Sequence, residues 1–304
     1  MKCRTCDIGM KNIESTLSNN WQNTDIELSP TKWSEILKPL QPEIIHVMGT
    51  EPLMYHDINN LLYELNKISK TLRITTNGWY IEKYFDSLVK YCDRIGVSID
   101  GIEQTHDKIR GVSGGFERAF NGLIKLNENG KETRVSYTIT PDNMDDMFPL
   151  YRKLSGRGIL LVFNHYNFYP GKNTTAFNPQ SINIKKLSEL VRAFKNKKHV
   201  TFEPMLNNDK ELREYYQKTP DKNIKQGTGC RTLERFLKGQ SASIRADGRF
   251  IVPARCWIGI EFGYAENGLT TLTNNKQLQE AVKKFRKNGI PPRCQRLCCA
   301  GKCV

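Results

Sequence analysis

The chain begins with two cysteines, Cys3 and Cys6, that are separated by two residues. Thiolates at this spacing can bind one side of a zinc ion or an iron–sulfur centre, but a four-coordinate metal needs more ligands. Six further cysteines gather in the last third of the sequence: Cys230, Cys256, Cys294, Cys298, Cys299 and Cys303. In a reducing compartment, clustered cysteines are more often metal ligands than partners in disulfides. The spacing therefore predicts two thiolate centres in one chain.

The composition limits the classes of protein that remain. In 304 residues no apolar run is long enough to span a bilayer, and the polar start does not resemble a signal peptide. We therefore expect a cytoplasmic protein without a membrane span, and we disfavour a secreted disulfide framework. The net charge of +14 would suit a polyanion, but the basic residues are dispersed over predicted helix faces. A nucleic-acid partner is thus a minor alternative.

Apolar runs and helical patterns alternate along most of the chain. Strands are expected at 43–48, 72–75, 94–99, 133–139 and 158–164, and helices at 30–40, 58–68, 81–91, 116–128, 144–154 and 184–196. This alternation predicts an α/β fold with a parallel sheet and helical crossovers. Further along, Asp247-Gly248 lies between alternating apolar residues and predicts a β-hairpin over 242–252, followed by a helix over 277–287.

Three of the expected strands end in small, polar or glycine-rich segments: Gly49-Thr50-Glu51-Pro52, Thr76-Asn77-Gly78 and Ser98-Ile99-Asp100-Gly101. These residue types also form ordinary turns, so each segment alone carries little information. In parallel sheets, however, the carboxyl ends of the strands lie at one edge, where active sites form. Together the three segments predict a binding site at that edge, facing the loop of Cys3 and Cys6.

The order of these segments, with His106-Asp107-Lys108-Ile109-Arg110-Gly111 after the third, resembles the core of the radical S-adenosylmethionine (SAM) enzymes. The family loop reads Cys, three residues, Cys, two residues, Cys, so Cys3 and Cys6 match its second and third ligands. The first ligand would fall two places before Met1. The resemblance implies a partial (β/α)6 TIM-like barrel with its first strand missing, and an N-terminus truncated within the cysteine motif. It also implies that the chain as given holds its cluster poorly.

The resemblance implies a [4Fe-4S] cluster that binds SAM and cleaves it to a 5′-deoxyadenosyl radical for hydrogen abstraction. Residues Gly49, Thr50, Glu51 and Pro52 match the family element beside the SAM amino group, although Thr50 replaces a glycine. Ser98 and Asp100 match the strand end near the ribose. Arg110 is either a partner of the SAM carboxylate or a surface arginine. An external electron donor such as flavodoxin or ferredoxin is also implied, and no catalytic side chain is assigned.

The last third of the chain resembles the auxiliary-cluster domains of this family, of the SPASM or shorter twitch type. Residues 1–205 would form the core, 206–229 a connector and 230–304 the auxiliary domain. Its six cysteines exceed the four ligands of one [4Fe-4S] cluster and fall short of eight for two. A structural zinc site is the alternative.

Two kinds of enzyme, and one non-enzyme, fit this reading. The first is a maturase or oxidoreductase that modifies a peptide or protein side chain. The second is a dehydrogenase or epimerase of a sugar or another small metabolite. A catalytically impaired iron–sulfur or zinc-binding protein is the alternative of a different class.

Overall fold

The structure is a computed structural model that describes residues 1, 3–6, 27–166, 178, 181–216, 230–251 and 262–288. Cys256, Cys294, Cys298, Cys299 and Cys303 lie outside the described residues. Their predicted role as ligands therefore stays a prediction.

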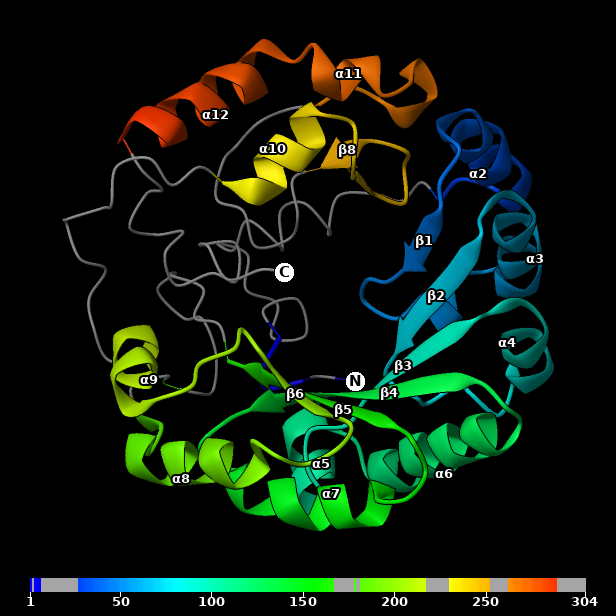
Figure 1. Cartoon of the computed structure of the whole chain (residues 1–304). Helices are drawn as coiled ribbons and strands as arrows, with labels where there is room; N and C mark the ends of the chain where they lie inside the picture. Colours follow the sequence, from blue (N-terminus) through cyan, green and yellow to red (C-terminus); the bar gives the residue numbers. More distant parts are fainter. Residues whose placement is uncertain are drawn as a thin grey trace.

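Six parallel strands form one sheet in the order β1-β2-β3-β4-β5-β6. The strands are β1 (Ile44–Val47), β2 (Thr71–Thr76), β3 (Arg94–Ser98), β4 (Glu132–Ile139), β5 (Leu160–His165) and β6 (Val200–Glu203). Figure 1 shows them curving into an incomplete ring. The expected α/β fold with a partial TIM-like barrel is confirmed.

Helices precede, connect and follow the strands, and those between the strands cover the outer side of the curved sheet (Figure 1). They are α2 (Pro30–Leu37), α3 (Ile58–Ile68), α4 (Phe85–Tyr91), α5 (Glu103–Arg110), α6 (Gly115–Glu128), α7 (Met147–Leu154), α8 (Ile184–Phe194) and α9 (Asp209–Tyr216). Short 3₁₀ turns precede or follow some of them at Lys38–Leu40, Pro52–Met54 and Met144–Asp146. Ser29 caps α2 by accepting a hydrogen bond from the Lys32 N–H, and serine directly before a helix is typical of such a cap.

The two faces of the sheet differ in chemistry because side chains alternate along a strand. In β2, Leu72 and Ile74 are fully buried beneath the helices, whereas Arg73 and Thr75 on the other face are half-buried. In β4, Val135 and Tyr137 are buried in the same way, and Arg134 and Ser136 are half-buried. The outer face thus forms the hydrophobic core with the helices, and the inner face of the curved sheet is polar.

Three details differ from the sequence-based expectations. The mostly apolar residues of the strand over 43–48 predict that it is buried, but β1 is an edge strand of the described sheet, and Ile44 remains 51% exposed. The sixth strand, β6, was not expected, since its four residues carry too short a pattern to detect. The helix expected from Ile81 begins at Phe85, after a turn.

The last described part of the chain contains a predicted hairpin and helix. Strands β7 (Ser243–Ile244) and β8 (Phe250–Ile251) are antiparallel around Asp247-Gly248, and helices α10 (Arg231–Leu237), α11 (Thr270–Thr273) and α12 (Lys276–Asn288) surround them. This part has its own hydrophobic cluster, which Ile36 of α2 joins. It therefore packs against the barrel on the side of α2 (Figure 1). No helix among the described residues is long and apolar enough to cross a membrane.

Candidate functional site

The loop of Cys3 and Cys6 is fastened to the end of α5 and to the β4–α7 loop. The backbone N–H of Arg4 donates to the carbonyl of Ile109 over 2.8 Å, and the Arg4 guanidinium lies 3.3 Å from the Asp142 carboxylate. Within the loop, the Cys6 N–H donates to the Cys3 carbonyl over 3.2 Å. The structure thus places the two cysteines at the carboxyl edge of the sheet, facing the strand ends as the sequence predicts.

A buried ion pair lies directly beneath this loop. Arg110 Nη2 is 2.6 Å from Asp100 Oδ2, and the Asp100 side chain is fully buried. The other carboxylate oxygen of Asp100 accepts the backbone N–H of Thr138 over 2.7 Å, which ties the end of β3 to β4. Arg110 also contacts the Cys3 sulfur. Asp100 and Arg110 therefore support the cysteine loop from below.

Cys3 lies in an environment of opposing influences. Burial raises the pKa of its thiol, the Arg110 guanidinium acts to lower it, and the Asp100 carboxylate raises it again. A thiol whose pKa is raised is a poor nucleophile, whereas metal binding deprotonates it. The site therefore suits Cys3 as a metal ligand better than as a reactive thiol.

Glu51 connects the ends of β1 and β2. Its Oε1 accepts hydrogen bonds from the Leu53 N–H over 3.1 Å and from the Thr76 hydroxyl over 2.6 Å, and its Oε2 accepts the Asn77 N–H over 2.7 Å. Burial raises the pKa of Glu51, an effect that these hydrogen bonds oppose. The carboxylate is thus engaged with the protein itself, and it fixes the exposed residues Gly49 and Thr50 at the edge of the sheet.

The second and third strand ends follow the sequence-based expectation in part. Asn77 shapes its own turn, because its Oδ1 accepts the Trp79 N–H over 2.9 Å. Ser98 ends β3 on the polar inner face, opposite Ser136 of β4. Pro52 begins the short 3₁₀ turn that Glu51 caps. The structure thus brings Gly49, Thr50, Ser98 and the cysteine loop to one edge, with Glu51, Asp100 and Arg110 below the surface.

The His106–Gly111 segment owes its residue types to local structure. His106 Nδ1 accepts the Asp100 N–H over 3.1 Å, and the Asp107 carboxylate accepts the N–H groups of Gly114 and Phe116 at the start of α6. Burial, reinforced by Arg110, lowers the pKa of His106 to about 3, so the ring is neutral at pH 7. Gly111 adopts φ 65° and ends α5. His106, which the sequence left unassigned, therefore holds the Asp100 turn.

Asn143 is a second residue that the sequence reading missed. It is fully buried, and its Nδ2 donates to the carbonyls of Asp100 over 2.9 Å and Thr138 over 2.8 Å. The sequence does not indicate this role, because Asn143 lies in a Pro-Asp-Asn segment whose residue types are typical of an ordinary turn. Its amide joins the ends of β3 and β4 beneath the site.

Cys230 is the one cysteine of the last cluster that the structure describes. It precedes α10, is buried, and its sulfur accepts the N–H groups of Leu233 and Thr232, while burial raises its pKa. Within the described ranges no three His, Cys, Asp or Glu side chains gather as metal ligands. The auxiliary centre therefore stays a prediction.

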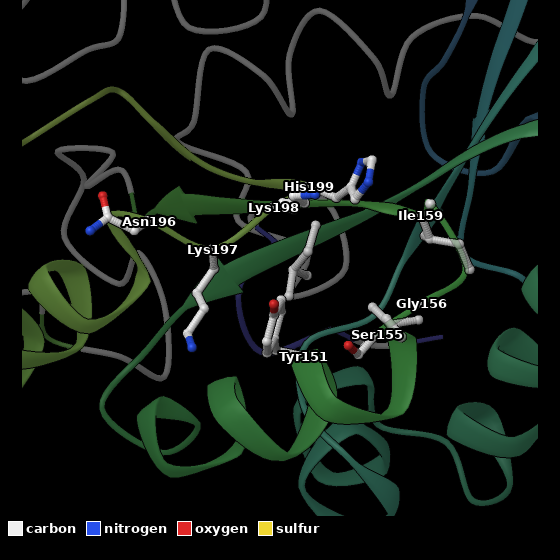
Figure 2. A pocket seen from close by; sticks show the side chains of 11 residues that line it. Tyr151, Ser155, Gly156, Ile159, Asn196, Lys197, Lys198 and His199 are labelled. Carbon is white, nitrogen blue, oxygen red and sulfur yellow. The ribbon is translucent and has the colours of Figure 1, made fainter.

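A separate hollow of about 330 Å³ lies away from this site. Figure 2 shows the side chains that line it, among them Tyr151, Lys197 and His199. Ile159 and His199 directly precede β5 and β6, so the hollow lies at the amino edge of the sheet, opposite the cysteine loop. Active sites of such sheets lie at the carboxyl edge, and we therefore place the candidate site there.

A parallel α/β barrel with a cysteine loop at the carboxyl edge of its strands defines a class of metal- and cofactor-binding enzymes. The family model described as "Radical SAM superfamily" matches residues 1–154, and the chain belongs to this superfamily.

Two curated relatives share part of this chain. It is 28% identical over 183 residues to the Fe-coproporphyrin III synthase of Methanosarcina barkeri, which covers 59% of this chain and 44% of the relative. It is 24% identical over 171 residues to the sporulation killing factor maturation protein SkfB of Bacillus subtilis, covering 54% of this chain and 41% of the relative. The chain thus spans less than half the length of these relatives.

Crystal structures of Streptococcus suis SuiB share the fold. With SuiB bound to S-adenosylmethionine the TM-score is 0.66 at 17% identity, over 92% of this chain and 64% of SuiB. With SuiB bound to the precursor peptide SuiA it is 0.66 at 16% identity, over 99% of this chain and 68% of SuiB. At this identity the likeness supports the fold alone.

Proposed function

We propose that this chain is a radical SAM oxidoreductase or maturase that modifies a peptide or protein side chain. The observation that carries the proposal is the position of the cysteine loop, which rests on Arg110 and Ile109 at the carboxyl edge of the barrel. When bound there, a [4Fe-4S] cluster with SAM supplies the one-electron cleavage that produces a 5′-deoxyadenosyl radical. The substrate class is inferred from the likeness to SkfB and to peptide-bound SuiB.

The residues at the edge fit such a centre in part. Cys3 and Cys6 are free thiols on one short loop, and the Arg110 cation beside Cys3 favours its thiolate form. They would supply two of the three thiolates that leave one iron open for a cofactor. A third thiolate would have to come from outside the described residues.

The remaining residues would bind and orient SAM. Gly49 and Thr50 are exposed after the end of β1 and would offer backbone groups to the SAM amino group, while Ser98 on the inner face would lie near the ribose. Because the oxygens of Glu51 and Asp100 already hold backbone and side-chain partners, we propose that both residues position this surface. Arg110 is committed to Asp100 and Cys3, so we assign it to the loop rather than to the SAM carboxylate.

We further propose that residues 230–304 form an auxiliary-cluster domain of the SPASM or twitch type. Its support is the buried Cys230 beside the Asp247-Gly248 hairpin, together with the five cysteines outside the described residues. A zinc site with the same thiolates is the competing form. Iron and zinc contents of an anaerobic preparation distinguish the two, and a colourless zinc-loaded domain would contradict an auxiliary cluster.

The test of the activity is the formation of 5′-deoxyadenosine from SAM and dithionite after reconstitution with iron and sulfide. It is run on the chain and on a variant chain extended at its N-terminus so that a cysteine lies two residues before Met1, which gives the spacing of three cysteines that the family loop has. We expect the product from the extended chain, and loss of the product when Cys6→Ala is added, because an iron ligand is removed.

Cys92→Ala is the matched control, since Cys92 is a free cysteine buried in the core, away from the loop. It is expected to keep the product. If neither the chain nor the extended chain forms 5′-deoxyadenosine, the proposed activity is wrong, and the alternative of an impaired iron–sulfur or zinc protein stands.

A further inference from the structure

Two arginines on the polar inner face of the sheet have no carboxylate partner among the residues that the structure describes. Arg73 of β2 and Arg134 of β4 are half-buried, and Arg73 Nε is buried with no hydrogen-bond partner among the described residues. Neither guanidinium forms an ion pair in the described part of the chain. By contrast, Arg94 at the lower end of the same face pairs with Glu132 over 2.6 Å.

The geometry of β3 brings the two arginines toward each other. Gly96 lies between Thr75 of β2 and Arg134 of β4 in the register of the sheet. A Cβ atom at Gly96 would be 3.1 Å from Arg134 Nε and 3.0 Å from Thr75 Oγ1. The absent side chain therefore leaves room for Arg134 to lie across β3 toward β2.

His46 lies beside Thr75 on the same face of the sheet. Its Nε2 lies 2.9 Å from Thr75 Oγ1, and it is paired with Arg73 in the strand register. The pKa of His46 is lowered to about 4 by burial and then by the charges of Arg134 and Arg73. The imidazole is therefore neutral at pH 7 and does not itself need a counter-ion.

Arg73 and Arg134 are two cations on the same half-buried face of the sheet. Such charges repel each other, and an anion that binds between them stabilises both. Guanidinium forks match the two oxygens of a carboxylate. Above them on the same face lie hydroxyl groups of Ser136 and Thr138, which suit a peptide. Thr138 is four residues from Arg134 along β4, about 13 Å at the usual rise per residue, so the arginines lie below the candidate SAM site.

We propose that Arg73 and Arg134 bind a carboxylate of the substrate, namely an acidic side chain of a peptide that enters the barrel. This inference rests on the proposed peptide substrate, and it names a chemical feature of that peptide. Thr75 and His46 line the same place with neutral hydrogen-bonding groups.

The experiment titrates the full chain with a capped glutamate, N-acetyl-glutamic acid amide, and follows the arginine Nε–H signals by NMR. Arg73→Gln and Arg134→Gln assign the two signals by their loss. We expect both signals to shift on titration with the capped glutamate and to stay in place with the capped glutamine. Each glutamine variant should weaken binding by about 10-fold or more, because a hydrogen bond to a charged group contributes 1.5–3 kcal/mol.

Arg157→Gln is the control with the same change of charge. Its partner Glu128 lies 3.0 Å away in an exposed pair on the outer side of the barrel, so binding should not change. Arg73→Lys and Arg134→Lys keep the charge but lose the planar fork. They are expected to bind the capped glutamate more weakly than wild type. They test the proposal in place of a glutamine variant that does not fold.

Three results would overturn the proposal. The first is that the capped glutamate moves neither signal. The second is that only inorganic phosphate moves them, which would assign the site to a phosphate group. The third is that S-adenosylhomocysteine moves them and the capped glutamate does not, which would assign the carboxylate to the cofactor. The titration uses neither cluster nor reductant, so its failure is distinct from a failure to form 5′-deoxyadenosine.

Discussion

The carboxylate of Asp100 lies 2.6 Å from the guanidinium of Arg110, and the same guanidinium contacts the sulfur of Cys3. One ion pair thus connects the end of β3, the last turn of α5 and the cysteine loop. Because Asp100 is fully buried and the Arg110 side chain is only 13% exposed, each charge depends on the other. The order of the candidate site therefore rests on this pair.

Asp100→Asn is expected to lower the free energy of unfolding by about 3–5 kcal/mol, since it leaves the Arg110 cation buried without a counter-ion. Urea unfolding measures the loss. Glu128→Gln removes the carboxylate of the exposed pair with Arg157 and should cost about 1 kcal/mol or less. Equal losses in the two variants would show that the buried pair does not stabilise the fold.

Glu51→Gln tests the connection between the ends of β1 and β2. The amide retains one acceptor oxygen but cannot accept the Asn77 N–H as Oε2 does. We expect unfolding to become easier by about 1–3 kcal/mol, the usual effect of an unsatisfied buried group, and SAM to bind more weakly. Urea unfolding and equilibrium dialysis with SAM provide the two measurements.

Glu64→Gln is the control for this change, because Glu64 is half-buried and pairs with the exposed Lys67 within α3. It should alter stability and SAM binding only slightly. If Glu51→Gln has an effect no larger than Glu64→Gln, the hydrogen bonds of Glu51 do not position the strand ends.

The strands and most helices could be predicted because their signals are local. Alternating apolar residues in β2 and β4, the Ser29 cap of α2 and the Asp247-Gly248 turn each depend on neighbours in the sequence. The order of strand ends also sufficed to identify the carboxyl edge, since parallel strands share one direction.

The rest depends on contacts between distant segments. The exposure of β1 follows from its place at the edge of the sheet, which its own four residues do not encode. The roles of Arg110 and Asn143 follow from the position of Asp100, which lies 10 and 43 residues away in the chain. Ile36 packs with the last part of the chain rather than with the barrel, and only the folded structure shows this.

Gly78→Ala tests the close approach of the β2 end to α6. Gly78 has φ +85°, and a Cβ atom there would lie 2.6 Å from the Ala119 Cβ. We expect a loss of about 2–4 kcal/mol from the left-handed backbone and the overlap together. Gly130 has φ +77°, and a Cβ atom there would meet no described atom within 4 Å. Gly130→Ala therefore has only the backbone strain, and it should lower the free energy of unfolding by about 1–2 kcal/mol. Equal losses in urea unfolding would mean that α6 moves away at no cost.

His106→Asn tests the pH dependence of the Asp100 turn. The asparagine oxygen can replace Nδ1 as the acceptor of the Asp100 N–H, but it does not titrate. The pKa of His106 is about 3 in the folded protein and 6.5 in the unfolded reference, so the unfolded state binds more protons between these values. The contribution of His106 to the free energy of unfolding is therefore fully present above pH 6.5. It decreases as the pH falls, by about 2 kcal/mol at pH 5.

The variant should therefore lose less stability than wild type between pH 7 and pH 5 in urea unfolding. Part of the decline remains, because burial also lowers the pKa of His165 to about 3. The double variant His106→Asn/His165→Asn should flatten the profile further, since it removes a second group that must be neutral in the folded state. If the pH profile of His106→Asn parallels that of wild type, the prediction is wrong. His106 would then accept a proton without disturbing the turn, and the Asp100 N–H would not require the ring nitrogen of His106.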